Sequence, residues 1–152
     1  MGRLVELLVE ADEGRPVAAA KKRESRGKLK FVARLVKFWA TCRTPQTPLL
    51  SFHIELLLAH SRLCTGGKGY ARCVAETLGL LSDRQLAGLR DPVGISAIVS
   101  AAKTEAQRRQ ALSAVGAAAE RAARAVVAEE TRRLEEAYRL WNLVFNGHFP
   151  KA

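Results

Sequence analysis

The stretch FVARLVKFW, residues 31–39, decides the fold class, because its apolar residues recur with the period of an α-helix. Three cationic residues belong to this stretch or directly precede it: Lys30, Arg34 and Lys37. On a helix they fall within a sector of about 60° around the axis, and apolar residues cover the rest of the surface. We therefore expect a core helix, spanning about residues 29–42, that carries one basic stripe. Long cationic side chains usually lay their stems over apolar surface and keep their charges in water, so a solvated stripe is the simplest interpretation.

The segment that follows predicts a loop and then a second helix. RTPQTPLL, residues 43–50, cannot be helical in its middle, because Pro45 and Pro48 lack amide donors and bias the preceding residues toward extended geometry. We expect this loop to end at Ser51, which is a suitable N-cap for the almost continuously apolar segment FHIELLLAHSRL. A helix of that composition is expected to be central in the fold.

The glycine-rich run CTGGKGY, residues 64–70, is expected to be a loop that binds no phosphate in the Walker manner. The Walker pattern needs a glycine five positions before Gly67, where this chain has Arg62. It also needs a Ser or Thr after a Gly-Lys pair, and Gly69 stands there. The three glycines are therefore read as a connection between helices.

Two further pieces of helix are expected before the C-terminal third of the chain. A helix is predicted from Tyr70 to Leu81, with Ser82 or Asp83 capping a short piece after it. Asp91 followed by Pro92 signals a stop and a restart. The restart is expected to give a short helix whose apolar residues are Ile95, Ile98 and Val99.

The longest helix is predicted from Thr104 to about Phe145. Thr104 and Gln107 fit a capping box, alanine is the best helix former, and the Gly and Pro of NGHFP close the segment. The small alanines predict close packing between helices. The expected apolar face comprises Leu112, Val115, Ala119, Ala122, Val126, Val127, Leu134, Ala137, Trp141 and Phe145. Because no alternating strand pattern is found, we predict an all-α fold of five to seven helices.

Composition indicates one globular domain with an anionic partner. The chain has 152 residues, is 48% hydrophobic and has a formal net charge of +10. We expect a helical domain over residues 29–150, preceded by an N-terminal segment, residues 1–28, that contains a short amphipathic helix at residues 3–11 and then a basic connection. Nucleic acid and a nucleoside triphosphate would both suit the charge, and charge alone does not choose between them. The basic residues concentrate at Lys21, Lys22, Arg23, Arg26, Lys28, Lys30, Arg34, Lys37 and Arg43.

Other features argue against a membrane, disulfides and metal binding. No apolar run of about 18 residues is present and the N-terminus is acidic where a signal peptide would be apolar, so we expect a cytoplasmic protein without a membrane partner. The three cysteines, Cys42, Cys64 and Cys73, form no CxxC pair and are expected to be small buried hydrophobes. His53 and His60 are seven residues apart and share a helix face, but the sequence offers no third ligand, so no metal site is predicted.

Several of these segments together resemble a known family. RLVKFW, the proline-containing loop, LLSFHIELLLA, the Asp-Pro segment and the terminal EEAYRLWNLVFNGHFP are similar to the C-terminal helical domain of the oligoadenylate synthetase-like nucleotidyltransferases, which include the bacterial cyclic dinucleotide synthases of anti-phage signalling. The resemblance covers residues from about 29 to 150. It implies that residues 29–150 are a nucleotide-binding-type domain that backs the cleft of a nucleotidyltransferase.

The resemblance also implies which residues meet the nucleotide. Lys37 would reach the triphosphate, Ser51 would offer its hydroxyl to the same phosphates, and Arg34 would join them from the basic stripe. The chemistry agrees, because a lysine is a compact cation on a flexible stem and a helix start offers free amides and a favourable dipole. Glu55 is expected to orient a neighbouring Lys or Arg and to take no part in chemistry. Ser51 has the simpler interpretation of a plain N-cap, which is compatible with this role.

The chain departs from the family in its catalytic residues. Nucleotidyl transfer by two metals needs an Asp-x-Asp pair after a Gly-Ser turn and a third Asp on another strand. The nearest acidic pair here, Glu10 and Asp12, follows no Gly-Ser. We therefore expect a truncated or split enzyme that is inactive alone, binds no metal itself, and needs a catalytic lobe in cis or in trans to hold Mg²⁺ or Mn²⁺. The alternatives are a basic helical nucleic-acid or protein adaptor, and an enzyme of another class, for which no nucleophile with a base is identifiable.

Overall fold

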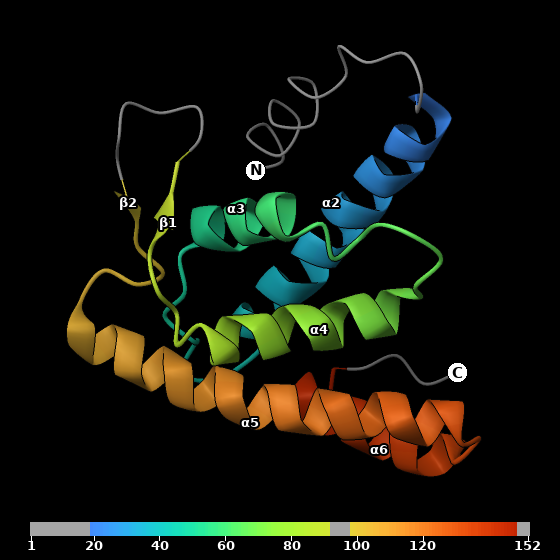
Figure 1. Ribbon diagram of the computed structural model, residues 1–152. Helices are drawn as coiled ribbons and strands as arrows, with labels where there is room; N and C mark the ends of the chain where they lie inside the picture. The colour runs from blue at the N-terminus through green and yellow to red at the C-terminus, as the bar shows by residue number, and fades with distance from the viewer. Residues whose placement is uncertain (1–18, 92–97, 149–152) are drawn as a thin grey trace.

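The computed structural model describes residues 19–91 and 98–148, and within this part of the chain it contains five helices and one small sheet. The predicted helix at residues 3–11 and the residues around Ile95 lie outside the described part. The prediction of an all-α fold with five to seven helices is confirmed, because each strand has only two residues. The elements are α2 (Ala19–Thr41), α3 (Ser51–Ser61), α4 (Tyr70–Asp83), β1 (Leu89–Arg90), β2 (Ile98–Val99), α5 (Glu105–Glu130) and α6 (Leu134–Val144) (Figure 1).

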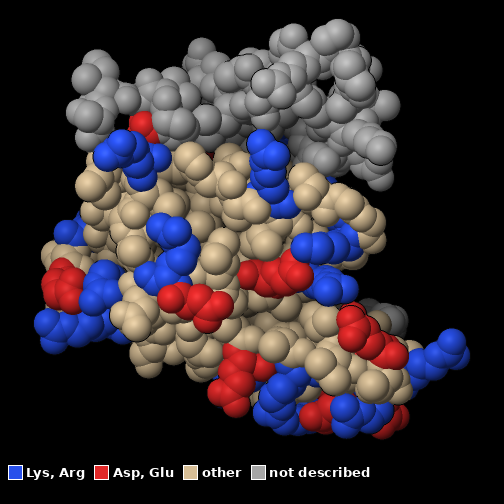
Figure 2. Space-filling view, in the orientation of Figure 1, with Lys and Arg blue, Asp and Glu red and all other residues tan. Residues whose placement is uncertain are grey.

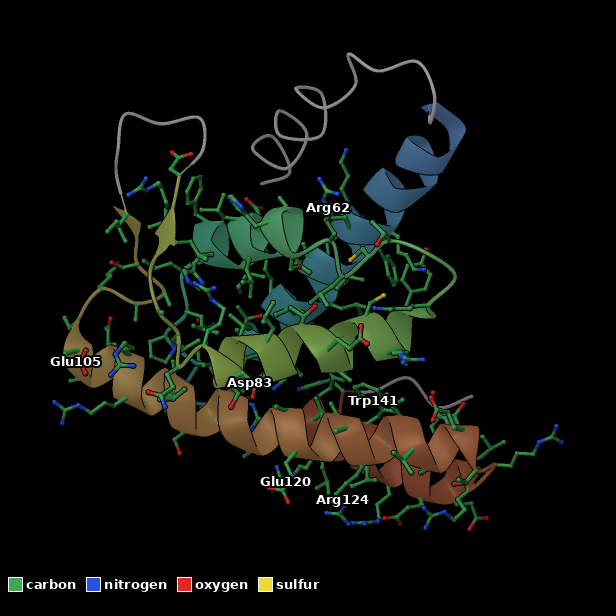
Figure 3. All side chains as sticks on the ribbon, in the orientation of Figure 1. Arg62, Asp83, Glu105, Glu120, Arg124 and Trp141 are labelled. Carbon is green, nitrogen blue, oxygen red and sulfur yellow. The ribbon has the colours of Figure 1, made fainter. Side chains whose placement is uncertain are left out.

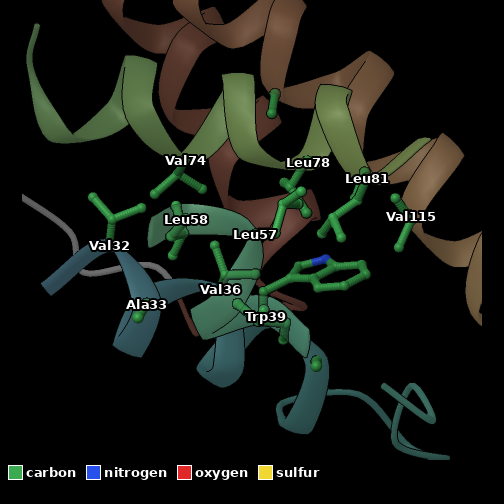
Figure 4. Packing of buried hydrophobic residues seen from close by; sticks show 14 of the residues in the cluster. Val32, Ala33, Val36, Trp39, Leu57, Leu58, Val74, Leu78, Leu81 and Val115 are labelled. Carbon is green, nitrogen blue, oxygen red and sulfur yellow. The ribbon is translucent and has the colours of Figure 1, made fainter. Parts of the chain in front are cut away.

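Helix α4 lies between two groups of helices. It packs against α2 on one side and α5 on the other, while α3 packs against α2 and α6 packs against α5 (Figure 1). Val36 and Trp39 of α2 meet Leu57 and Leu58 of α3 and Leu78 of α4 in the core (Figure 4). Burying one such side chain contributes about 1.5–3 kcal/mol, so this cluster fixes how α2, α3 and α4 sit together.

Helix α2 begins earlier than predicted. It starts at Ala19 instead of about residue 29, so the second part of the expected basic connection is helical. Its first turns are made of Ala, Lys, Arg and Glu, which are strong helix formers. Gly27 lies inside the helix and lowers its stability by about 1 kcal/mol, which the strong helix formers before and after it offset. Propensity thus extends a helix that the apolar pattern alone begins at Leu29.

The region between α4 and α5 differs from the prediction in two ways. Ser82 and Asp83 cap no separate piece, because they form the last turn of α4. Ile98 and Val99, which were predicted to be helical, form a strand that pairs antiparallel with β1, with Val99 opposite Leu89. The β-branched pair fits this pleated surface better than a helix, and the pairing partner is eight or more residues away in sequence.

A glycine is required where the two strands leave the core. A Cβ added at Gly88 would lie 2.5 Å from Cγ2 of Ile98, well inside the contact distance of two carbons. The close approach of the two segments therefore depends on the missing side chain. Without a side chain at position 88, the turn after α4 can lie beside the residues that precede α5.

The predicted long helix from Thr104 to Phe145 is two helices. Helix α5 ends at Glu130 and α6 begins at Leu134. Arg132 between them is left-handed, with a φ of 61°, and the amide of Arg133 donates to the carbonyl of Ala128 at 2.8 Å. These are the features of a Schellman ending, which usually has glycine at the left-handed position. Because arginine stands there, the sequence gives no sign of the break.

The reversal after α5 lets α6 fold back along it. Trp141 and Ala137 of α6 are buried, whereas Val127 and Leu134, which a single helix would have placed on the apolar face, are about half exposed. The predicted close packing is confirmed along α5, where the contacts with α4 and α6 use alanines with little or no exposed surface. These alanines are Ala111, Ala118, Ala122, Ala125 and Ala128.

The start of α5 provides a test of its predicted cap. Thr104 is extended, and its side-chain Oγ1 accepts a hydrogen bond from the amide of Gln107 at 3.1 Å. Thr104→Ala should lower the free energy of unfolding by about 1 kcal/mol, because that amide loses its acceptor, and Thr104→Ser should restore it. Urea unfolding followed by circular dichroism measures both. Ser113→Ala, at an exposed position within α5, should cause no loss; equal losses in the Ala and Ser variants at position 104 would contradict the cap.

Candidate functional site

The basic stripe of α2 is divided between the surface and the interior. Arg34 is exposed, but Lys37 is only 8% exposed. The interpretation of the stripe as a solvated face is therefore wrong at Lys37. The helix places Lys37 on the side that meets α3, and burying an ammonium there requires a charged partner.

That partner is Glu55 of α3. The ammonium of Lys37 donates to Oε1 of Glu55 in a buried ion pair. Both side chains are nearly excluded from water, with 9% and 7% of their surfaces exposed. The expectation that Glu55 orients a neighbouring cation is confirmed. The pair joins the RLVKFW segment to the SFHIELLLA segment, which are the two segments that carried the family resemblance.

Ser51 lies at the start of α3 but does not cap it. Leu50 is the N-cap, no side chain caps the helix, and Ser51 is the first helical residue. The amide of Leu50 donates to the carbonyl of Ala101 at 2.8 Å, which ties this loop to the segment before α5 and sets where the helix begins. The hydroxyl of Ser51 is therefore not used as a cap, and the residue is exposed.

The ion pair joins the two helices that carry the predicted site residues. Ser51 and Glu55 are four residues apart on α3, so they lie on the same face one turn from each other. Arg34 and Lys37 are three residues apart on α2 and are neighbours on that helix for the same reason. Since Lys37 meets Glu55, Arg34 and Ser51 both lie within about one helical turn of the pair.

His53 is the second ionisable residue buried in α3. Its Nε2 lies 3.0 Å from the carbonyl oxygen of Ala87, and because a carbonyl only accepts, Nε2 carries the proton and donates. Nδ1 is buried without a hydrogen-bond partner among the described residues. Burial lowers the pKa of His53, the hydrogen bond to Ala87 opposes this, and the charge of Arg84 adds to the lowering. His53 is therefore held neutral.

The cysteines and histidines form no metal site in the part of the chain that the structure describes. Cys64 and Cys73 are buried free thiols, as predicted, and Cys42 is partly buried. Burial, together with the neighbouring Cys73, raises the pKa of Cys64 to about 12. A thiol with such a pKa is a poor nucleophile, so Cys64 serves packing.

Sequence reasoning missed a group of basic residues around a pocket near the start of α5. The pocket has a volume of about 440 Å³ and is lined by Arg84, Lys103 and Arg108 among others. These residues come from three different segments, so no local pattern reveals that they meet. The turn signals around Asp91 and Thr104 are the parts of the sequence that could have pointed to it.

No family model and no curated protein matches the chain. The helices of the described part are all too short or too polar to cross a membrane.

The buried ion pair should be strongly coupled. Glu55→Gln leaves the ammonium of Lys37 buried without its counter-charge and should lower the free energy of unfolding by about 3–5 kcal/mol. Removing both charges in Lys37→Met/Glu55→Leu should restore most of that loss. Urea unfolding of the variants measures the coupling.

The half-exposed pair of Lys68 and Glu76, joined at 2.9 Å, is the matched control. Glu76→Gln should cost no more than about 1 kcal/mol, because water screens that pair. A double variant at positions 37 and 55 that is no more stable than Glu55→Gln would contradict the assignment, since the loss would then come from packing alone.

His53 should make the stability depend on pH. Its folded pKa lies below the unfolded value near 6.5, so the unfolded chain takes up the proton first as the pH falls. The contribution of neutral His53 to the free energy of unfolding should be fully present above about pH 6.5. It should decrease as the pH falls toward the lowered folded pKa, by no more than about 1.4 kcal/mol per pH unit for this one proton. Urea unfolding between pH 7.5 and 5 measures the slope.

His53→Gln should flatten this slope, and His60→Gln, at the exposed histidine of the same helix, should leave it unchanged. The slope is the quantity to compare, because His53→Gln also changes the packing. An unchanged slope in His53→Gln would show that other groups cause the pH dependence.

Proposed function

We propose that this helical domain is the substrate-binding module of a nucleotidyltransferase and that it binds a nucleoside triphosphate where α2 and α3 meet. The enzyme class is the one that the segments RLVKFW and SFHIELLLA resemble, whose members make oligonucleotide or cyclic dinucleotide messengers in antiviral and anti-phage signalling. The catalytic carboxylates and their Mg²⁺ or Mn²⁺ would be supplied by a lobe in cis or in trans. The chain alone carries out no transfer in this proposal.

The observation that carries the proposal is the Lys37–Glu55 pair. It joins the two segments on which the resemblance rests. Arg34 is three residues before Lys37 on α2, and Ser51 is four residues before Glu55 on α3, so each lies about one helical turn from the pair. Glu55 neutralises one charge there, so the remaining positive charge comes from Arg34. A guanidinium can donate two parallel hydrogen bonds to a phosphate, which makes Arg34 the more effective first contact.

Lys37 would act after this first contact. Its ammonium has three protons, and Glu55 accepts one of them. The flexible stem lets the ammonium keep Glu55 while it turns another proton toward a phosphate. In this arrangement Glu55 is a positioning residue that holds the ammonium of Lys37 at the junction of α2 and α3.

Apolar residues beside the basic stripe support a partner lobe. Phe31 and Phe38 of α2 are 45% and 44% exposed, and both lie within about one turn of Arg34. A contiguous exposed apolar surface is typical of a face that another domain covers. The rings of Phe31 and Phe38 pack on those of Tyr70 and Phe145, and close to half of each remains exposed. A catalytic lobe docked there would close the nucleotide between itself and α2.

The proposal is tested best at the exposed residues, because changes at Lys37 also disturb the ion pair. Arg34→Gln should weaken binding of ATP or GTP by about tenfold, since one charge-assisted contact near solvent is worth about 1.5 kcal/mol. Ser51→Ala should weaken it less. Calorimetry measures both, with Arg121→Gln on α5 as a control of equal charge.

The contrary result is equally specific. The proposed triphosphate site would be contradicted if Arg34→Gln and Ser51→Ala both bind with the affinity of the parent. The contradiction would be complete if the triple variant Lys21→Gln/Lys22→Gln/Arg23→Gln loses binding. A steep salt dependence of binding to duplex nucleic acid would then favour the basic adaptor.

A further inference from the structure

A basic pocket lies at the end of the molecule where α5 begins. The turn after α4, residues 84–88, forms one wall, and residues 100–104 with the first turn of α5 form the other. Its volume of about 440 Å³ is in the range of pockets for small ligands. Figure 2 shows Lys and Arg side chains around an acidic one at this end of the molecule, and Figure 3 places Glu105 at the same end of α5.

The charge of this α4–α5 pocket, as we name it, is positive. Arg84 and Lys103 line it and form no ion pair within the described part of the chain. Glu105 is the one acidic residue among the described residues of the lining. Nε and Nη2 of Arg108 donate to its carboxylate at 2.9 and 2.7 Å. Hydrogen bonds from Arg108 lower the pKa of Glu105 to about 2, so that carboxylate is ionised and already neutralised. Arg84 and Lys103 supply the excess charge.

The walls of the pocket are held in place by hydrogen bonds. Nη1 of Arg108 donates to the carbonyl of Gln85 at 2.7 Å, which ties α5 to the turn after α4. Leu86 is buried beneath that turn, and its amide donates to the carbonyl of Leu81 at 3.1 Å. On the other wall, Thr104 is fixed by its bond to the amide of Gln107. The cations therefore stand on a preformed surface, which reduces the ordering cost of binding.

We propose that the α4–α5 pocket binds a small phosphate-bearing anion. Arg84 and Lys103 offer a planar fork and a compact cation, the two groups that bind phosphate best, and the hydroxyls of Ser100 and Thr104 line the same space. Among the described residues no aromatic side chain lines the pocket, so these residues offer no surface on which a base could stack, and the phosphate itself is the group recognised. The residues of this site differ from those of the triphosphate site at α2 and α3. The two sites are linked through the backbone, because the carbonyl of Ala101 in the pocket lining accepts from the amide of Leu50, next to Ser51.

Inorganic pyrophosphate is the probe, and calorimetry with amide chemical shifts is the measurement. The full chain should bind it, with shifts concentrated in residues 84–88 and 100–108. Arg84→Gln/Lys103→Gln should weaken binding by at least about tenfold, since both excess cations are lost. The control Arg121→Gln/Arg124→Gln removes equal charge about 24 Å or more along α5 from Glu105 and should change affinity by less than about twofold. Figure 3 shows Arg124 far along α5 from Glu105.

The outcomes separate this site from the first. Equal losses in the two double variants would show binding to net charge alone and would overturn the proposal. Shifts confined to residues 34–37 and 51–55 would place pyrophosphate at the α2–α3 site and would also overturn it. Absence of binding at millimolar pyrophosphate would do the same. All four positions changed are exposed or partly exposed, and unchanged thermal unfolding of each variant confirms that folding is preserved.

Discussion

Six consecutive residues of α3, His53–Leu58, are buried, and two of them carry ionisable side chains. A buried charge or ring nitrogen needs a partner, so the elements around α3 must supply one. Helix α2 provides Lys37 for Glu55, and the turn after α4 provides the carbonyl of Ala87 for His53. The positions of α2 and of that turn relative to α3 are therefore set by polar contacts as well as by the apolar core. The candidate triphosphate site and one wall of the α4–α5 pocket both follow from these two contacts.

The helix endings show how burial can outweigh local preference. Arg132, Gln85 and Leu86 all have positive φ, although none is a glycine. A left-handed residue with a side chain costs about 1–2 kcal/mol, so each is held by what it permits elsewhere. The turn at Arg132 lets Trp141 and its neighbours pack against α5, and the turn at Gln85 and Leu86 closes α4 and presents Arg84 to the pocket. In each case a hydrogen bond to a carbonyl of the last helical turn completes the ending.

The sequence predicted which residues form the candidate triphosphate site, but it did not predict which of them are buried. Local pattern places Arg34 and Lys37 on one side of a helix, and it places Ser51 and Glu55 on one face of another. It cannot tell that Lys37 faces inward, because the apolar stem of lysine fits either a surface or an interior position. The pocket residues Arg84, Lys103 and Arg108 are far less accessible to prediction, since they meet only through the turn after α4.

The sequence by itself determined the all-α class, the loop at residues 43–50, the presence of a glycine-rich loop between α3 and α4, and the cap at Thr104. These depend on periodicity, on proline and glycine, and on hydrogen bonds between residues close in the chain. The tertiary structure alone decided that the C-terminal segment folds back after Glu130, that Ile98 and Val99 pair with β1, and that Lys37 is buried. Each of these depends on a contact between residues distant in sequence, whose energy exceeds the local preference that opposes it.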